Sequence, residues 1–272
     1  MKNSILEVKN LNLSALNGKN STQILRNVSF ELEYGARIGL VGHSGAGKSM
    51  TMSVITGSTE KNMIIDGSVL FGIDADKVDI LQMNEKQRRK FCSQNVAIVP
   101  QDSINALNPY RCVRDQVIET IRFHKRLSRA QANEQFEDLM KSIDIDSNIS
   151  KKYPYQFSGG MRQRIAIAMA LESNAKILIA DEPTTALDAI NQLKLIEFIN
   201  AICSQREIAL IYISHNLSLI ANICEQVLIM KGGEIIESGK MEDVFSSPKE
   251  RFTKELIEGT RKLYENEQHR EK

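Results

Sequence analysis

The chain has 272 residues, of which 42% are apolar, and this is enough to bury a sizeable core in one large domain or in one domain that carries a subdomain. Lysine and arginine number 35 against 34 for aspartate and glutamate, so the net charge of +1 gives no general electrostatic reason to expect DNA, RNA or anionic lipid as the main partner. The cysteines form no C-x-x-C pair and no metal-finger spacing, which favours scattered reduced thiols in a cytosolic compartment.

The N-terminal half begins with strand patterns. Residues 5–13 and 25–32 alternate between apolar and polar side chains, which predicts two half-buried antiparallel strands joined by a polar loop over 17–22. Residues 37–41 form a short apolar run of the kind found in a sheet that is covered on both faces.

Later apolar runs predict buried parallel strands separated by helical segments, at 96–99, 176–180 and 208–213. This alternation indicates an α/β core. Residues 102–171 interrupt it with helical signals, among them the capping-box spacing of Ser128 and Gln131, and we interpret this stretch as a helical insertion.

The C-terminal part predicts a hairpin over 227–237 and a last helix with Ser247 as N-cap and Pro248 as first residue. The longest apolar run, 165–171, is far below the roughly 20 residues that span a bilayer, and we expect any membrane association to come through a partner. The predicted organisation is a single domain over 1–272. It consists of an α/β core over 1–101 and 172–245, a helical subdomain over 102–171, and a C-terminal helix and tail over 246–272.

A glycine-rich segment, GHSGAGKS, matches G-x-x-x-x-G-K-S and lies between a predicted strand and a predicted helix, as the phosphate-binding motif requires. Glycines let backbone N–H groups turn toward phosphates, Lys48 supplies a point charge at the β and γ oxygens, and the Ser49 hydroxyl can ligate Mg²⁺. A flexible glycine turn would not need the flanking strand and helix, so we favour nucleotide binding. The predicted contacts are Gly42, His43, Ser44, Gly45, Ala46, Gly47, Lys48 and Ser49.

Two carboxylates, Asp181 and Glu182, end the predicted strand at 176–180, where a parallel sheet opens its carboxyl edge to a ligand. Asp181 is placed to hold Mg²⁺, and Glu182 to polarise the water that attacks the γ-phosphate. An Asp-Glu pair is by itself more often a helix N-cap. The phosphate loop favours the catalytic hypothesis.

The segment FSGGMRQR precedes a predicted helix, with Ser158 as a suitable N-cap and backbone donors at Gly159 and Gly160 that can bind an anion. Composition alone does not exclude a glycine hinge. The segment resembles the signature sequence of the ATP-binding cassette family, usually Leu-Ser-Gly-Gly-Gln, with phenylalanine and methionine as variants.

Three further residues resemble motifs of that family, in family order. Gln101 resembles the Q-loop glutamine, which contacts Mg²⁺ and the attacking water and links the site to the transmembrane partner. Asp188 resembles the D-loop aspartate, which communicates across the dimer, and His215 the switch histidine that contacts the γ-phosphate. A glutamine or histidine at a strand end is alone more often structural, whereas the ordered set indicates the family.

The resemblance implies an α/β P-loop NTPase (RecA-like) core with an N-terminal antiparallel β subdomain and an inserted helical subdomain. It implies that ATP and Mg²⁺ are bound where two such domains pack head to tail, so that Ser158 and Gly160 serve the nucleotide of the partner. Catalysis is assigned to Glu182, His215, Gln101 and Lys48, and Mg²⁺ binding to Ser49, Gln101 and Asp181.

The segments YPYQFSGGMRQR and ADEPTTALD resemble the ATPases of bacterial oligopeptide, dipeptide and nickel importers, over about residues 4–258. The implied partners are a second, paralogous ATPase subunit, two transmembrane permease subunits and an external solute-binding protein, with this chain on the cytoplasmic face of the membrane and no nucleic acid bound. Many peptide importers carry a longer, cysteine-containing C-terminal extension, and its absence here favours nickel or a metal chelate. The aromatic residue that usually stacks on adenine is missing from 11–29.

A soluble cassette ATPase that acts on ribosomes or nucleic acid is the alternative from another class. Such factors usually carry two cassettes or a long coiled coil together with basic contacts, and the sequence shows neither. A cassette that binds ATP without hydrolysing it is opposed by Glu182 and His215.

Overall fold

A computed structural model describes most of the chain, namely residues 4–18, 20–73, 76–101, 106–146, 148, 151–184 and 187–270. It divides into two compact units, one formed by Met1–Cys92 with Ala209–Lys272 and the other by Ser93–Ile208. Within the described residues, no helix combines the length and the apolar character that a bilayer crossing requires.

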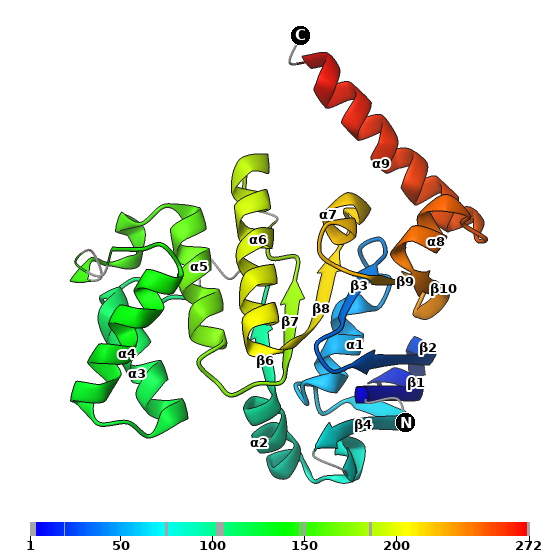
Figure 1. Cartoon of the computed structure of the whole chain (residues 1–272). Coiled ribbons are helices and arrows are strands. Elements are labelled where there is room, and N and C mark those ends of the chain that lie inside the picture. Colours follow the sequence, from blue (N-terminus) through cyan, green and yellow to red (C-terminus); the bar gives the residue numbers. More distant parts are fainter. Residues whose placement is uncertain are drawn as a thin grey trace. The chain divides into compact units, whose positions relative to one another are not determined.

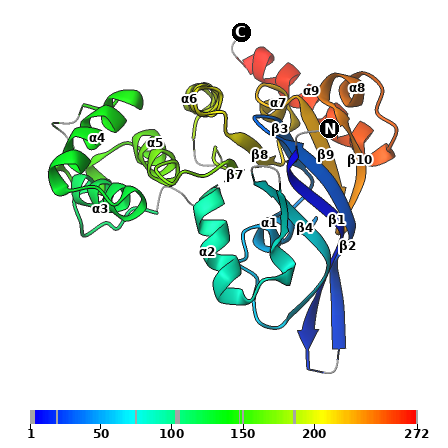
Figure 2. The same ribbon diagram turned by 60° about the horizontal axis from the view of Figure 1, so that its bottom comes forward.

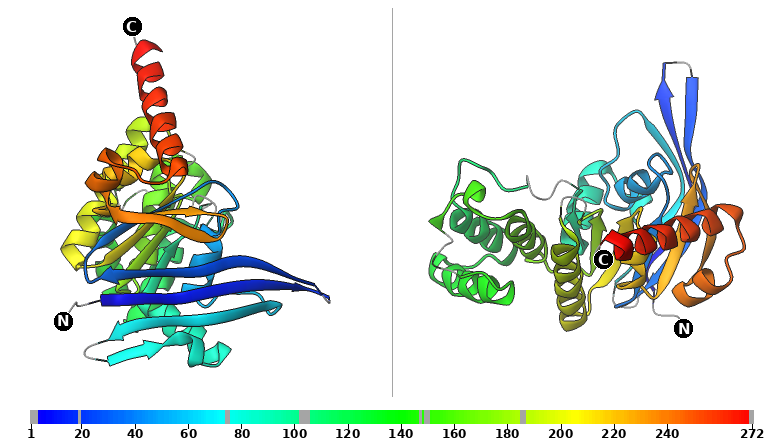
Figure 3. Two further views of the ribbon diagram at one scale, coloured as in Figure 1. Left: turned by 90° about the vertical axis from the view of Figure 1, so that its right-hand side faces the viewer. Right: turned by 90° about the horizontal axis from the view of Figure 1, so that it is seen from above.

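The first unit contains an antiparallel sheet in the order β2-β1-β4-β5, whose strands are β1 (Ser4–Asn17), β2 (Asn20–Glu33), β4 (Met63–Ile73) and β5 (Asp76–Asp79). β1 and β2 pair to their ends, with Asn17 opposite Asn20, and form the long ribbon seen in Figures 2 and 3. The predicted loop over 17–22 is therefore wrong. Its polar residues belong mostly to the strands, because ladder pairing uses backbone groups and leaves these side chains exposed.

A second sheet in this unit holds the strand that leads to the glycine-rich loop. β3 (Arg37–Val41) is parallel to β8 (Ala209–Ser214) and to β9 (Gln226–Lys231), and β9 forms an antiparallel hairpin with β10 (Glu234–Lys240). Every residue of β8 is buried. The predicted hairpin and the apolar strands predicted at 37–41 and 208–213 are confirmed.

Figure 1 shows the helices of the first unit together with these strands. They are α1 (Lys48–Ile55), η1 (Ile80–Gln82), α7 (Leu217–Ala221), α8 (Met241–Ser246) and α9 (Arg251–Arg270), while α2 (Glu85–Asn95) contains the boundary between the units.

The last helix begins later than predicted. Ser247 follows α8 as its C-cap and Pro248 lies before α9, so both are outside the helix that they were expected to begin. The carboxylate of Glu237 on β10 instead accepts the backbone N–H groups of Lys249 and Glu250, at 2.8 and 3.1 Å. A residue distant in sequence thus satisfies the donors at this helix start.

The second unit pairs β6 (Val96–Val99) in parallel with β7 (Ile177–Asp181). Its helices are α3 (Val113–Lys125), α4 (Arg129–Ser142), η4 (Pro154–Gln156), α5 (Gly159–Ala170) and α6 (Ala189–Arg206). In Figures 1 and 2, α3, α4 and α5 lie side by side, around a core in which Ile121, Phe136 and Ile165 are fully buried. The capping box of Ser128 and Gln131 is present at the start of α4, as predicted.

Candidate functional site

The phosphate-binding loop joins β3 to α1, as the motif predicts. A Cβ atom on Gly42 would lie 2.3 Å from the carbonyl oxygen of Met230, and Gly47 has a φ of +105°, so neither position accepts a larger residue without strain. The N–H group of Gly233 donates to the carbonyl of Ala46 at 2.9 Å. The β9–β10 turn therefore supports the end of the loop.

Lys48 begins α1 and is 7% exposed. Its ammonium group donates to the carbonyl oxygens of Gly42 at 2.7 Å and His43 at 3.1 Å. Ser49 follows in the first turn of α1 and is exposed. The helix has no side-chain cap at Gly47, so the start of α1 presents backbone donors beside one fixed cation, which suits a phosphate.

The other predicted residues of this loop lie on its outer part, where His43, Ser44 and Gly45 are exposed. The carbonyl of His43 also accepts the N–H group of Ala46, at 3.1 Å. The described geometry therefore fits a phosphate cradle built from the backbone.

His215 lies at the same sheet edge as the start of the loop. In the parallel pair of β3 and β8, Val41 is opposite Ser214, and Gly42 and His215 are the next residues along each strand. Parallel strands end at a common edge, so the structure brings His215 and the phosphate loop together within the first unit. Asn216 caps α7 by accepting two backbone N–H groups.

The second unit brings Gln101, Asp181 and Glu182 together. Val99 is opposite Ala180 in the β6–β7 pair, so Gln101 and the two carboxylates follow the ends of neighbouring strands. The Nε2 atom of Gln101 donates to Glu182 Oε2 at 3.2 Å.

Glu182 adopts a φ of +45°, in the left-handed region that residues with a side chain rarely occupy. Such conformations cluster at functional sites, where the surrounding structure holds them. Asp144 and Glu207 also have a positive φ, at 55° and 53°, so Glu182 is distinguished by this conformation together with its hydrogen bond from Gln101. Sequence inspection could not have found either feature.

Ser158 caps α5, as predicted, and its hydroxyl accepts the N–H group of Met161 at 3.3 Å. Gly159 and Gly160 form the first helical positions. A Cβ atom on Gly160 would lie 3.8 Å from Asn191, at the beginning of α6. The signature segment and the start of α6 are therefore neighbours in this unit.

Asp188 is the N-cap of α6. Its carboxylate accepts the backbone N–H of Asn191 at 3.0 Å and the side-chain amide of the same residue at 2.6 Å. These hydrogen bonds from Asn191 lower the pKa of the Asp188 carboxyl. Residues 102–105, which follow Gln101, and residues 185–186, which belong to the segment ADEPTTALD, lie outside the described residues.

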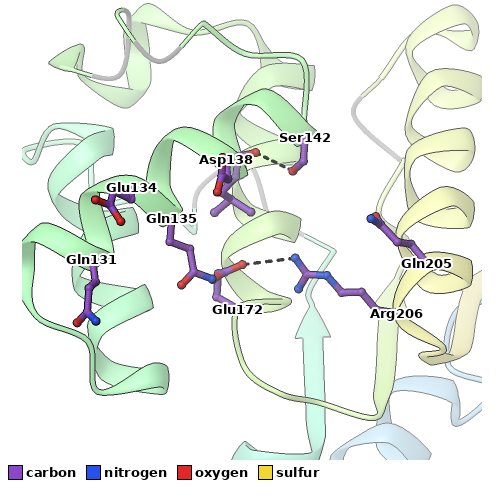
Figure 4. A pocket seen from close by; sticks show the side chains of 9 residues that line it. Gln131, Glu134, Gln135, Asp138, Ser142, Glu172, Gln205 and Arg206 are labelled. Atoms are coloured by element: carbon purple, nitrogen blue, oxygen red, sulfur yellow. Dashed lines mark hydrogen bonds and ion pairs between the residues drawn. The ribbon is translucent and has the colours of Figure 1, made fainter.

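A cavity of about 570 Å³ in the second unit lies between α4 and the end of α6 (Figure 4). Its described lining includes none of the predicted site residues. Glu172, which is 1% exposed, accepts from Gln135 at 2.9 Å and forms ion pairs with Lys125 at 2.9 Å and Arg206 at 3.6 Å. These contacts explain the buried carboxylate as a structural link between helices.

Comparison with known proteins gives consistent matches. A family model described as ABC transporter matches residues 25–185. The oligopeptide transport ATP-binding protein OppD of Salmonella typhimurium is 35% identical over 263 residues, which cover 96% of this chain and 77% of OppD. The dipeptide transport ATP-binding protein DppD of Bacillus subtilis is 36% identical over 257 residues, which cover 93% of this chain and 76% of DppD.

Among solved structures, the ATP-binding cassette MJ0796, determined as a dimer in a post-hydrolysis state bound to ADP and Pi, is similar with a TM-score of 0.73 and 24% identity. The match covers 87% of this chain and 98% of the cassette. At this identity the likeness establishes the fold, which is the predicted α/β cassette.

Proposed function

Because this chain belongs to the ABC transporter family and is an ATP hydrolase, we propose that it is the ATP-hydrolysing subunit of a bacterial importer for peptides or for nickel and other metal chelates. One observation carries the proposal: the chain is 35% identical to an oligopeptide transport ATP-binding protein over 96% of its length. The nickel alternative is supported by the segments that peptide and nickel importers share.

ATP binding is assigned to the first unit. Backbone donors at the start of α1 would surround the phosphates, and the Lys48 ammonium, which donates to two carbonyls of the loop, would approach the β and γ oxygens. The hydroxyl of Ser49, with Asp181 and Gln101, would hold Mg²⁺. The ion supplies neutralisation of charge on the transferred phosphoryl group.

Hydrolysis is assigned to Glu182 as the general base. The hydrogen bond from Gln101 orients the carboxylate through Oε2, and a carboxylate is a group that can accept a proton from water. His215, at the edge shared with the phosphate loop, is assigned to the γ-phosphate. These roles follow from the residues and from the family resemblance.

ATP-dependent pairing of two cassettes completes each site in this proposal. Ser158, Gly159 and Gly160 at the start of α5 would offer backbone donors to the nucleotide of a partner, and Asp188 caps the neighbouring helix. The similar cassette MJ0796 is itself a dimer. Hydrolysis would separate the pair and move attached permease subunits.

The partners of this proposal are a second, paralogous ATPase, two transmembrane permeases and an external solute-binding protein, with the chain on the cytoplasmic face of the membrane. Affinity purification of the tagged chain from detergent-solubilised cells tests it. We expect two polytopic membrane proteins and a second ATPase in the complex. Association with ribosomes and none with membranes would favour the alternative, a soluble ATPase of the translation apparatus.

The transported solute is tested on the binding protein recovered with the complex. Calorimetric titration with a peptide library and with Ni²⁺ chelates separates the two cargo classes. Binding of neither class would contradict the importer branch proposed here.

A further inference from the structure

The phosphate loop has a second support, outside its motif, in the first turn of α9. The ring of Phe252 meets the ring of His43 edge to face, with centroids 5.0 Å apart and planes at 84°. His43 is exposed on the loop, whereas Phe252 is 7% exposed. From this contact we infer that Phe252 is a positioning residue, which acts through His43 to hold the phosphate loop in its ATP-binding conformation.

The ring contact of His43 is linked to the Lys48 ammonium, the group that we assign to phosphate binding. The backbone carbonyl of His43 accepts a hydrogen bond from the Lys48 ammonium and also accepts the N–H group of Ala46. A displacement of His43 therefore shifts the lysine and the turn of the loop together. The inference rests on the proposed function of this loop in ATP binding.

Phe252 is itself held in place. The ammonium of Lys231, at the end of β9, lies 4.9 Å from the centroid of the Phe252 ring, a distance at which a cation and an aromatic ring attract. Glu237 fixes the approach to α9 through Lys249 and Glu250. The start of α9 therefore fixes Phe252, and Phe252 in turn holds the loop through its contact with His43.

The β9–β10 turn and the phosphate loop also meet through the backbone. Gly233, two residues after Lys231, donates to the carbonyl of Ala46, and the carbonyl of Met230 closes on Gly42. These contacts hold the two ends of the loop, whereas the ring of Phe252 contacts its outer part at His43. The side-chain contact therefore adds to the hydrogen bonds that the His43 carbonyl accepts within the motif.

A role for Phe252 only in packing α9 predicts something different. Substitution would then lower the stability of the protein and leave the affinity of the folded chain for ATP unchanged. A positioning role predicts a loss of affinity that is separable from the loss of stability. The test therefore measures both quantities on the same variants.

The principal variant is Phe252→Leu, which keeps most of the apolar volume and removes the aromatic edge. We expect the ATP dissociation constant, measured by fluorescence titration, to rise about three- to ten-fold, the range of an aromatic pair. The apparent KM for ATP should rise by the same factor, while kcat at saturating ATP stays within about twofold. The control is Ile257→Leu, a buried position on the same helix, which should leave ATP affinity unchanged.

A double-mutant cycle decides whether the effect passes through His43. His43→Ala, at an exposed position, should weaken ATP binding to a similar extent, and Phe252→Leu should add nothing further in that background. Additive losses, or unchanged ATP affinity in Phe252→Leu while the parent binds ATP, would overturn the inference. Failure of the parent chain to bind ATP would instead contradict the proposed function of the loop.

Discussion

Lys48 is the residue on which phosphate binding depends in this chain, since its ammonium is buried in the loop and held by two carbonyls. We predict that Lys48→Ala abolishes tight ATP binding, with a loss of affinity of at least about a hundredfold, because a charge-assisted contact with the β and γ oxygens is removed. Equilibrium dialysis with labelled ATP measures this. Lys194→Ala, on the exposed face of α6, serves as the control, and retained tight binding in Lys48→Ala would count against the cradle.

Glu172 is the buried carboxylate beside the cavity of Figure 4. Glu172→Ala leaves Lys125 and Arg206 without this partner, and we predict a decrease of about 2 to 3 kcal/mol in the free energy of unfolding, the lower end for a buried pair because the cations are partly exposed. Urea denaturation measures it. Glu134→Ala, an exposed residue of the same cavity, should change the value by less than about 0.5 kcal/mol. Equal effects of the two substitutions would refute the structural role.

At the scale of elements, the attachment of α9 depends on Glu237. Partial burial raises the pKa of the Glu237 carboxyl, but the N–H group of Lys249, the side chain of Thr253, the N–H group of Glu250 and the charge of Lys249 together lower it by more, so that its pKa lies below the usual 4.5. A carboxylate with a lowered pKa stabilises the fold fully above its unfolded-state pKa. This stabilisation is lost as the pH falls through the folded-state pKa.

We therefore predict that Glu237→Gln lowers the free energy of unfolding by about 1 kcal/mol at neutral pH, the typical value of a helix-start contact. The difference between parent and variant should shrink progressively as the pH is lowered below 4.5. Thermal denaturation across this range measures it. Glu234→Gln, on the same strand, is the control, and a difference that does not change with pH would argue against charge as the cause.

At the scale of the whole molecule, we expect ATP hydrolysis by Glu182 to control the pairing of two cassettes. We predict that Glu182→Gln keeps ATP binding, lowers steady-state hydrolysis by about 10²- to 10⁴-fold and accumulates an ATP-bound pair of cassettes, because the proton acceptor is weakened while the phosphate cradle remains. Phosphate release and size-exclusion chromatography with ATP, in the presence of the second ATPase if one co-purifies, measure the two effects. Hydrolysis at the parental rate would refute the assignment of the base.

Much of the nucleotide site could be predicted from the sequence, because its chemistry depends on residue types at fixed spacing. Glycines, Lys48 and Ser49 between a strand and a helix predict a phosphate loop, and the structure has that arrangement. The capping box of α4 and the β9–β10 hairpin were likewise local signals. The β1–β2 ribbon was cut short, because the residues next to its turn are polar and pair through the backbone. β4 was missed although most of its residues are apolar.

The sequence by itself determined the family, the α/β class and the identity of the residues that can bind phosphate and polarise water, since these follow from side-chain chemistry and short-range order. Only the tertiary structure decided what supports them. The start of α9 is fixed by Glu237 from β10, Glu182 is held in a left-handed conformation, and Phe252 packs on His43 across more than two hundred positions of the printed sequence. Such contacts join segments distant along the chain, and no local pattern encodes them.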